Sequence, residues 1–364
     1  MATPAPAAAS SFRWRDLVWP VGLSLVVLGV IIGLTYRPGA YAQIVATLDL
    51  RVAALAPLAL LGLVVVGCVR LRFFSHQHLS WRGGVRGQFA WDFMSAVTPS
   101  PIGGAPLAGY FVAKDNRLPM GEAMALLLFA MLMDQVWFAT TIPLILIASG
   151  YVDVFPEAAG SIGQGVLAAY LVILWLWVGL FAFATLIRPQ VLSRLARWLV
   201  RSRWLQRLAP AVERETEALE ARAAVIRKES LGFFVAGYLL SAAIWMCRYL
   251  VLFVLIASVA QVPPFTTMIR IIGMWLTALL IPTPGSSGGM EGLFMLFVGP
   301  FLPLAARGVV VTVWRLLSYH LVIVIGLLVT MGTIREALAG RNGDEGQHRA
   351  EPEDGAHATA PRSA

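Results

Sequence analysis

The sequence predicts an all-α polytopic membrane protein with about six full spans and two re-entrant helical hairpins in an inverted repeat. Composition is the first observation: of 364 residues, 58% are hydrophobic and only 13% are charged, whereas soluble domains carry about a quarter charged residues. The second is that the apolar residues form runs long enough to span a bilayer. The third is that two of these runs are broken by similar Pro/Gly motifs. Helices satisfy their own backbone groups in lipid, which makes them the expected element.

The spanning segments are predicted from the length of the apolar runs. The first run is followed by a weak cleavage-like sequence, AYA at 40–42, but it is longer than a signal-peptide core, so we expect a membrane anchor. Two further apolar stretches, at 86–113 and 266–299, are interrupted by proline and glycine. The six full spans are expected at 17–36, 51–70, 120–149, 161–187, 230–259 and 308–332.

Basic residues predict the orientation, because cytoplasmic loops carry an excess of Lys and Arg. The net charge is +8, and arginines crowd the loop 188–229. The loop 150–161 has acids and no basic residue, so it is expected outside. We therefore expect the N-terminus 1–16, the loop 188–229 and the polar tail 333–364 to be cytoplasmic, with the tail disordered. The transmembrane domain between them is 17–332.

The loop 188–229 divides into two helical patterns. Its first part alternates arginine with apolar residues and tryptophan, which suits a helix lying on an anionic inner leaflet. Its second part, 211–229, mixes Glu and Arg at helical spacing and is typical of a solvated helix.

The two interrupted stretches predict re-entrant hairpins. The stretch 86–113 has basic residues at both ends, so it should enter from the cytoplasm and return there. The stretch 266–299 follows an outer loop, so it should enter from outside. The resulting units, 51–149 and 230–332, are separated by one span, which inverts the second unit. Inverted repeats with broken helices are typical of transporters.

The hairpin tips carry matching motifs: TPSPIGGAP at 98–106 aligns without gaps to TPGSSGGME at 283–291. Proline ends a helical ladder, and paired glycines allow tight turns. The helix that resumes offers unpaired N–H groups, which bind anions. Small residues also serve helix packing in membranes, which is the alternative interpretation. The candidate substrate-binding residues at the tips are Thr98, Gly103, Gly104, Thr283, Ser286, Ser287, Gly288, Gly289 and Glu291.

Ionisable residues inside spans cost about 2.5–3.5 kcal/mol each on insertion scales, so each is a functional candidate. We expect Glu291 and Asp134 to face Arg248 and Arg315 across a central cavity, with both arginines binding substrate. Asp134 and His320 are candidates for a charge relay, since imidazole titrates near neutral pH. The alternatives are a structural ion pair between Asp134 and Arg248, and a purely structural helix contact for His320.

Three segments carry a resemblance to a known family. LIPTPGSSGGMEGLF, VTPSPIGGAPLAGYFVAKDNRLPMGEAMALLLFAMLMDQV and VWRLLSYHLVIVIGLL resemble the membrane domain of lysylphosphatidylglycerol synthases, a flippase-like family of bacterial and archaeal membrane proteins, over roughly residues 20–335. The family often has a glutamate after the first glycine pair, where this chain has Ala105, so a two-carboxylate mechanism does not transfer. The soluble aminoacyltransferase domain of the family does not fit into 333–364.

The resemblance implies a lipid translocase in a bacterial or archaeal cell membrane, moving an anionic lipid such as phosphatidylglycerol or its lysyl form between leaflets. The sequence has no Walker-type loop, and we expect no cofactor, no metal and no nucleic acid. Expected partners are the anionic lipid and the bilayer, together with a homo-oligomer or a separate lipid-modifying enzyme. The alternatives are a membrane-embedded enzyme of polyprenyl- or phospholipid metabolism and an accessory subunit. Short outer loops without clustered His or Asp argue against the enzyme.

Overall fold

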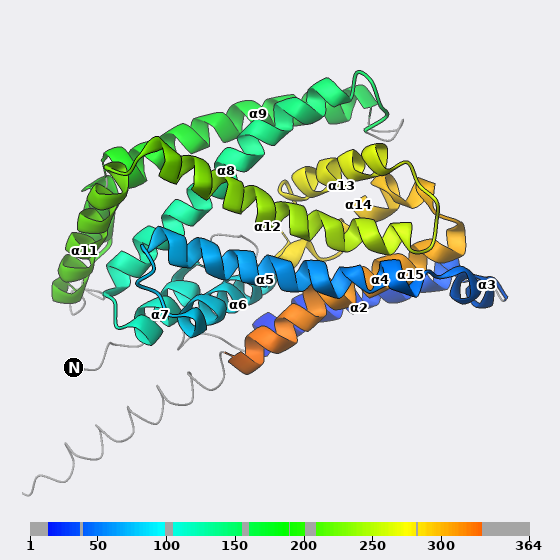
Figure 1. Ribbon diagram of the computed structural model, residues 1–364, viewed down its shortest axis with the longest axis horizontal. Coiled ribbons are helices and arrows are strands. Elements are labelled where there is room, and N and C mark those ends of the chain that lie inside the picture. Colours follow the sequence, from blue (N-terminus) through cyan, green and yellow to red (C-terminus); the bar gives the residue numbers. More distant parts are fainter. Residues whose placement is uncertain are drawn as a thin grey trace, which may run out of the picture.

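The computed structural model describes residues 14–36, 39–98, 105–154, 160–188, 190–200, 209–281 and 283–329, and these form helices and turns without strands. The helices form an elongated body, and several of the longest run along it (Figure 1). In chain order they are α2 (Trp14–Thr35), α3 (Ala40–Thr47), α4 (Leu50–Ala53), α5 (Leu55–Phe74), α6 (Trp81–Val97), α7 (Ala105–Asn116), α8 (Met120–Ala148), α9 (Gly160–Ala182), α10 (Gln190–Val200), α11 (Ala209–Arg227), α12 (Leu231–Ala257), α13 (Pro264–Ala278), α14 (Gly289–Phe297) and α15 (Leu304–Arg315).

Each segment predicted to span lies on a helix, although the described residues contain five helices, not six, that are long and apolar enough to cross a membrane. The segment predicted at 17–36 is the exception. It lies on α2, whose apolar part, Val21–Thr35, is shorter than the others. The last long helix continues beyond α15 to Val329 through a π-helical turn at Leu316–His320.

The two interrupted stretches form pairs of packed helices, α6 with α7 and α13 with α14. Local sequence sets their ends: the Ser80 side chain caps α6 by accepting from the Gly83 N–H at 3.0 Å, and α13 begins at a proline. The gap-free register that aligns Thr98 with Thr283 also aligns Met120, the start of α8, with Ala305 in the first turn of α15. The element order α5–α8 therefore recurs as α12–α15.

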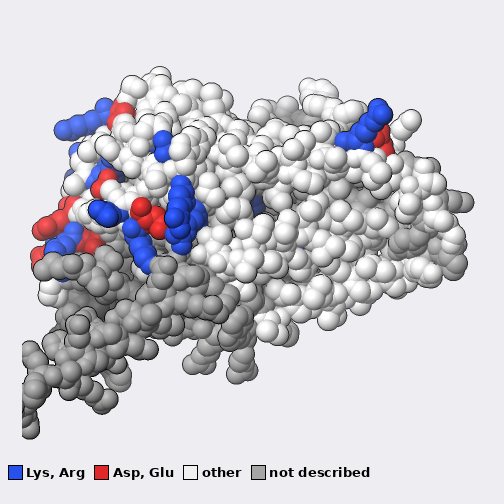
Figure 2. All heavy atoms as spheres, turned by 60° about the horizontal axis from the view of Figure 1, so that its bottom comes forward, with Lys and Arg blue, Asp and Glu red and all other residues white. Residues whose placement is uncertain are grey.

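The core lies between these two sets of helices. Fully buried Tyr249, Phe294 and Trp314 occupy the part around α12 to α15, and Phe74 and Phe111 occupy the part around the first helix pair. Many leucines point outward from the long helices, which suits a helix surface in contact with hydrocarbon. Figure 2 shows charged atoms gathered mainly at one end, where Figure 1 places α7 and α11, beside a broad uncharged middle. We call this the charged end.

The prediction of a solvated helix at 211–229 holds for one face only, because the other face of α11 packs along α8. The Gly121 N–H donates to Glu215 Oε2 at 2.6 Å, and Arg222 Nη2 donates to the Phe74 carbonyl at 2.5 Å. Ala223 and Ile226 are buried. Small and aliphatic residues recur at helical spacing among the charged residues of this segment, and they form the buried face. The mixed charges made this apolar pattern difficult to recognise in the sequence.

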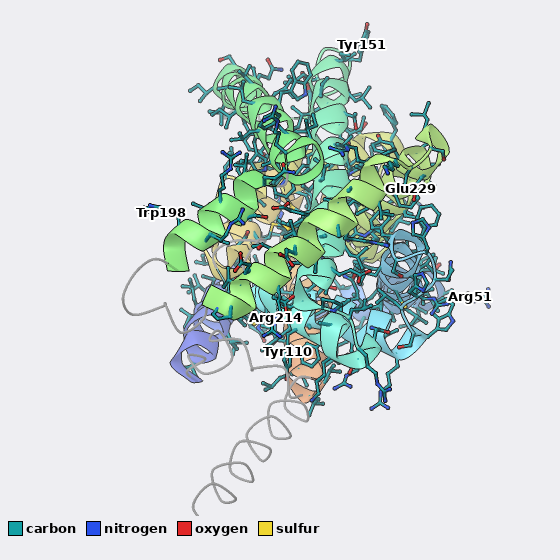
Figure 3. All side chains as sticks on the ribbon, turned by 90° about the vertical axis from the view of Figure 1, so that its left-hand side faces the viewer. Arg51, Tyr110, Tyr151, Trp198, Arg214 and Glu229 are labelled. Atoms are coloured by element: carbon teal, nitrogen blue, oxygen red, sulfur yellow. The ribbon has the colours of Figure 1, made fainter. Side chains whose placement is uncertain are left out.

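Helix α10 lies beside α11 with its apolar residues outward (Figure 3). Trp198 points away from the rest of the molecule. Val191, Leu195 and Trp198 are exposed at helical spacing, and Arg194 and Arg197 are also exposed. The amphipathic character predicted for this part of the loop is therefore present, while its contact with a leaflet stays a prediction.

Candidate functional site

The site is built on the turn between α13 and α14. Gly285 and Gly288 adopt positive φ angles of 56° and 80°, which glycine reaches without steric cost. The Ser286 N–H donates to the Thr283 carbonyl at 2.8 Å, and the Thr283 hydroxyl donates to the Ser287 carbonyl at 3.1 Å. The TPGSSGG sequence thus closes a tight turn and points the start of α14 into the protein.

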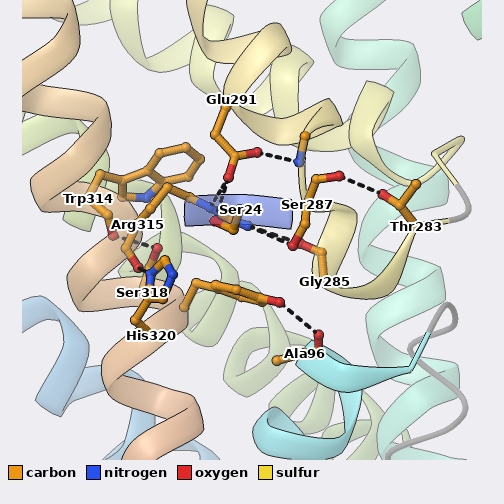
Figure 4. Close-up of polar contacts among 12 residues, drawn as sticks. Ser24, Ala96, Thr283, Gly285, Ser287, Glu291, Trp314, Arg315, Ser318 and His320 are labelled. Carbon is orange, nitrogen blue, oxygen red and sulfur yellow. Dashed lines mark hydrogen bonds and ion pairs between the residues drawn. The ribbon is translucent and has the colours of Figure 1, made fainter. Parts of the chain in front are cut away.

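Glu291 lies in the first turn of α14, and its side chain is 0% exposed. Oε2 accepts from the Gly288 N–H at 2.8 Å. Oε1 accepts from Arg315 Nε at 2.9 Å and from Ser24 Oγ at 2.9 Å (Figure 4). One carboxylate therefore caps α14 and joins it to α15 and α2.

Arg315 ends α15 and is 4% exposed. Its Nη2 lies 3.4 Å from Ser287 Oγ and 3.5 Å from the Gly285 carbonyl oxygen. The guanidinium also lies over the Tyr319 ring, 4.2 Å from the centroid. Tyr319 in turn donates to the Ala96 carbonyl at 3.4 Å, so the site lies where the second hairpin meets the end of α6.

The electrostatics of this cluster differ from the sequence-based expectation. An open helix N-terminus was predicted as the anion site, but the Gly288 N–H is already paired with Glu291. The chain thus supplies its own anion to the start of α14 and to Arg315. A buried pair of this kind is costly to break, because either partner alone is an unpaired charge in a low dielectric.

The alternative interpretation, a structural ion pair between Asp134 and Arg248, is wrong. Asp134 Oδ1 accepts from Arg70 Nη1 at 2.6 Å, and Arg70 also donates to Ser241 Oγ at 2.9 Å. Arg248 Nη2 instead donates to Asp92 Oδ1 at 3.1 Å. Because α5 continues to Phe74, four residues beyond the predicted end of the span 51–70, Arg70 lies inside the helix and reaches Asp134.

Within the described part of the chain, aromatic rings lie between Arg248 and the Glu291–Arg315 pair. Its guanidinium lies 5.1 Å from the Trp245 ring and 5.6 Å from the Trp275 ring. Trp275 packs edge-on against Trp314, with 6.1 Å between centroids. Of the four charges expected to face one another, only Glu291 and Arg315 are thus in direct contact.

The remaining predicted residues are placed as follows. The Thr98 hydroxyl donates to the Met94 carbonyl at 2.7 Å, at the end of α6. His320 Nδ1 lies 3.1 Å from the Arg315 carbonyl oxygen, and its buried Nε2 has no hydrogen-bond partner among the described residues. Gly289 begins α14. Gly103 and Gly104 lie outside the described residues.

Three contributors were missed by the sequence interpretation. Arg70 and Asp92 are ionisable residues within helices. They could have been found by the same rule that identified Asp134 and Arg248 as candidates, namely that an ionisable residue inside a span is functional by default. Ser24 carries no such signal, since hydroxyls are common in apolar helices. No group of three or more His, Cys, Asp or Glu side chains that could hold a metal occurs among the described residues.

Comparison with known proteins establishes the family. Residues 19–326 match the family model described as the lysylphosphatidylglycerol synthase TM region. The chain belongs to this family. A curated relative from Archaeoglobus fulgidus, described as a UPF0104 membrane protein, is 24% identical over 242 residues, which cover 65% of this chain and 71% of the relative. No solved structure gives a significant match. The family match begins within α2 and extends beyond α15, and together with the apolar helices it makes this a multi-pass membrane protein.

Proposed function

We propose that this protein moves an anionic lipid between the two leaflets of a bilayer. The observation that carries the proposal is the fully buried Glu291–Arg315 pair at the tip of a helical hairpin. The family description suggests phosphatidylglycerol or its lysyl form as the substrate class. The phosphate of such a lipid is the chemical counterpart of the carboxylate that Arg315 already binds.

In this proposal, the helix pairs α6–α7 and α13–α14 are re-entrant hairpins that enter from opposite faces. The charged end is cytoplasmic, as the excess of arginine there predicts. The two units rock against each other and expose the site to each leaflet in turn. A cell membrane of a bacterium or archaeon is the proposed location.

Exchange of anions is the proposed chemical step. The lipid phosphate takes the place of the Glu291 carboxylate on Arg315, on Ser24 Oγ and at the start of α14. Glu291 rebinds when the lipid leaves. Arg315 thereby stays paired throughout, and the displaced Glu291 carboxylate turns to the water that enters with the headgroup, because an unpaired buried charge would cost about 3–5 kcal/mol.

The test is headgroup-resolved lipid movement in proteoliposomes, with fluorescent phosphatidylglycerol and a fluorescent polyprenyl phosphate as separate probes. Arg315→Ala should lower the initial rate at least about tenfold, because a hydrogen bond to a charged group contributes about 1.5–3 kcal/mol. Glu291→Gln should also slow movement, since it leaves Arg315 without its resting partner. Arg51→Gln is the control, because Arg51 is exposed and distant in sequence from Glu291 and Arg315. This variant should leave the rate unchanged.

A double variant separates function from structure. Glu291→Leu with Arg315→Met replaces the pair by apolar side chains, which often restores the stability lost in either single variant. We expect this protein to be folded, by thermal unfolding in detergent, and inactive. A folded double variant that moves lipid at the original rate would show that the pair only holds α14 to α15, and would reject the proposed site.

A further inference from the structure

A groove at the charged end has chemistry that the central site does not use. It has a volume of about 500 Å³ and lies between the first turns of α6 and the end of the last helix. Its lining residues are Trp81, Arg82, Val85, Arg86 and Val329. It therefore combines two guanidinium groups with an apolar wall.

The basic side of the groove is held in place by its neighbours. Arg86 Nη1 donates to Asp115 Oδ1 at 3.1 Å, and the guanidinium lies 5.5 Å from the Phe111 ring centroid. Arg82 is exposed, and no carboxylate within the described ranges lies at ion-pair distance from it. Within the described ranges, Arg82 thus adds to the groove a positive charge that no carboxylate pairs.

Trp81 forms a fixed aromatic edge beside these arginines. It is 58% exposed, and the Arg72 guanidinium lies 4.4 Å from its ring centroid. Arg72 itself donates to the Leu79 carbonyl and to Gln77 Oε1. Exposed tryptophan beside arginine is typical of the depth where lipid headgroups meet hydrocarbon.

The opposite side of the groove continues into the lipid-facing surface. Val329 ends the described part of the last helix, and its neighbours Val324 and Leu328 are 54% and 68% exposed. Acyl chains can lie along this apolar surface while a phosphate contacts the arginines. A soluble phosphate compound would use only the basic half of such a site.

From the groove, the contact between α6 and the last helix leads to the central site. A Cβ added to Gly326 would meet the Phe93 side chain, so the helices touch there. Farther along, Tyr319 donates to the Ala96 carbonyl, and Tyr319 lies under the Arg315 guanidinium. We call this line of contact the α6 seam.

We propose that the groove is the docking site for the phosphate headgroup of an anionic bilayer lipid, and that this lipid then passes along the α6 seam to Arg315. Docking is argued from the groove alone. Onward passage rests on the proposed translocation function.

Native mass spectrometry of the full chain tests docking, with phosphatidylglycerol and phosphatidylcholine as probes. Arg82→Gln should reduce phosphatidylglycerol adducts roughly fivefold, the effect of one arginine near an anionic lipid surface. Val85→Trp should reduce them by filling the groove. Leu58→Trp, at a lipid-facing position on α5 that is 61% exposed, and Arg51→Gln are matched controls that should keep the adducts. Arg86 is left intact because it also holds Asp115.

Adducts that persist in both groove variants, or that form equally with phosphatidylcholine, would overturn the docking site. A dimer lost in Val85→Trp without any lipid adduct would instead assign the groove to a second copy of the chain. Lipid movement in proteoliposomes tests the passage: Val85→Trp should slow it, and normal movement despite lost adducts would overturn the route. If the original protein moves no lipid while the adducts depend on Arg82, docking stands and the proposed function fails.

Discussion

At the scale of single residues, the turn before α14 shows how closely the two hairpins approach each other. Gly285 has a φ of +56°, and a Cβ at this position would lie 2.7 Å from the Ala96 carbonyl oxygen and against the Tyr319 ring. Ser286 also adopts a positive φ of 50°, which costs a residue with a Cβ about 1–2 kcal/mol. The turn therefore accepts strain in order to bring Arg315, Ser287 and α6 together.

Gly285→Ala is expected to lower the free energy of unfolding by at least about 1–2 kcal/mol, the cost of left-handed backbone for a residue with a Cβ. The clash with Ala96 adds to this loss, because backbone must shift to relieve it. Gly292→Ala is the matched control, since it lies in the same segment, has open space around its Cβ and gains helix propensity. Thermal unfolding in detergent measures both. If Gly285→Ala and Gly292→Ala unfold at the same temperature, the turn before α14 does not contact the end of α6 as described.

At the scale of elements, sequence reasoning located the helices well and their partners poorly. Hydropathy is a local property, so the segments around Asp134, Arg248 and Arg315 fall on helices as predicted. Which side chains meet depends on how each helix is rotated and which helix lies beside it. This is why Asp134 pairs with Arg70 and Arg248 with Asp92. The contact of Glu291 with Arg315 could be predicted, because the motif and the last helix were both recognisable in the sequence.

The packing of α11 on α8 gives a prediction at this scale. A Cβ on Gly121 would overlap the Glu215 backbone oxygen and lie 3.0 Å from the Leu219 nitrogen. Gly121→Ala should therefore push α11 away from α8, at about 1–3 kcal/mol, the usual cost of overpacking. Hydrogen exchange of the α11 amides should rise. Gly179→Ala on α9, where a Cβ meets nothing within 4 Å, should leave α11 protected. Unchanged exchange in Gly121→Ala would contradict the packing.

At the scale of the whole molecule, a carboxylate–guanidinium pair joins each hairpin to another helix. Asp92 on α6 pairs with Arg248 on α12, and Glu291 on α14 pairs with Arg315 on α15. By contrast, the described contacts that the end of α6 makes near the site are neutral: the Ala96 carbonyl accepts from the Tyr319 hydroxyl of the last helix, and Gly285 approaches the same carbonyl closely. Neutral contacts separate at lower cost than buried ion pairs. Because Asp92 belongs to the first repeat unit and Arg248 to the second, an ion pair joins the units at that point, whereas the neutral contacts at the end of α6 are the ones that separate at the lower cost.

Cross-linking the end of α6 to the turn before α14 should stop lipid movement if the two repeat units move against each other. Ala96→Cys with Ser286→Cys, in a background where Cys68 and Cys247 are replaced by alanine, places one thiol at the end of α6 and one in the turn before α14. Oxidation should abolish lipid movement in proteoliposomes, and reduction should restore it. The control pair, Gly87→Cys with Val112→Cys, lies within the first hairpin, where a Cβ on Gly87 would be 2.8 Å from Val112 Cγ2. That disulfide should leave movement unchanged, because its two ends belong to one rigid unit. If lipid still moves when the cross-link between positions 96 and 286 is demonstrably formed, these two segments need not separate during transport. The lipid would then pass along the outer surface of the helices, and the buried pair would serve only to hold the second hairpin.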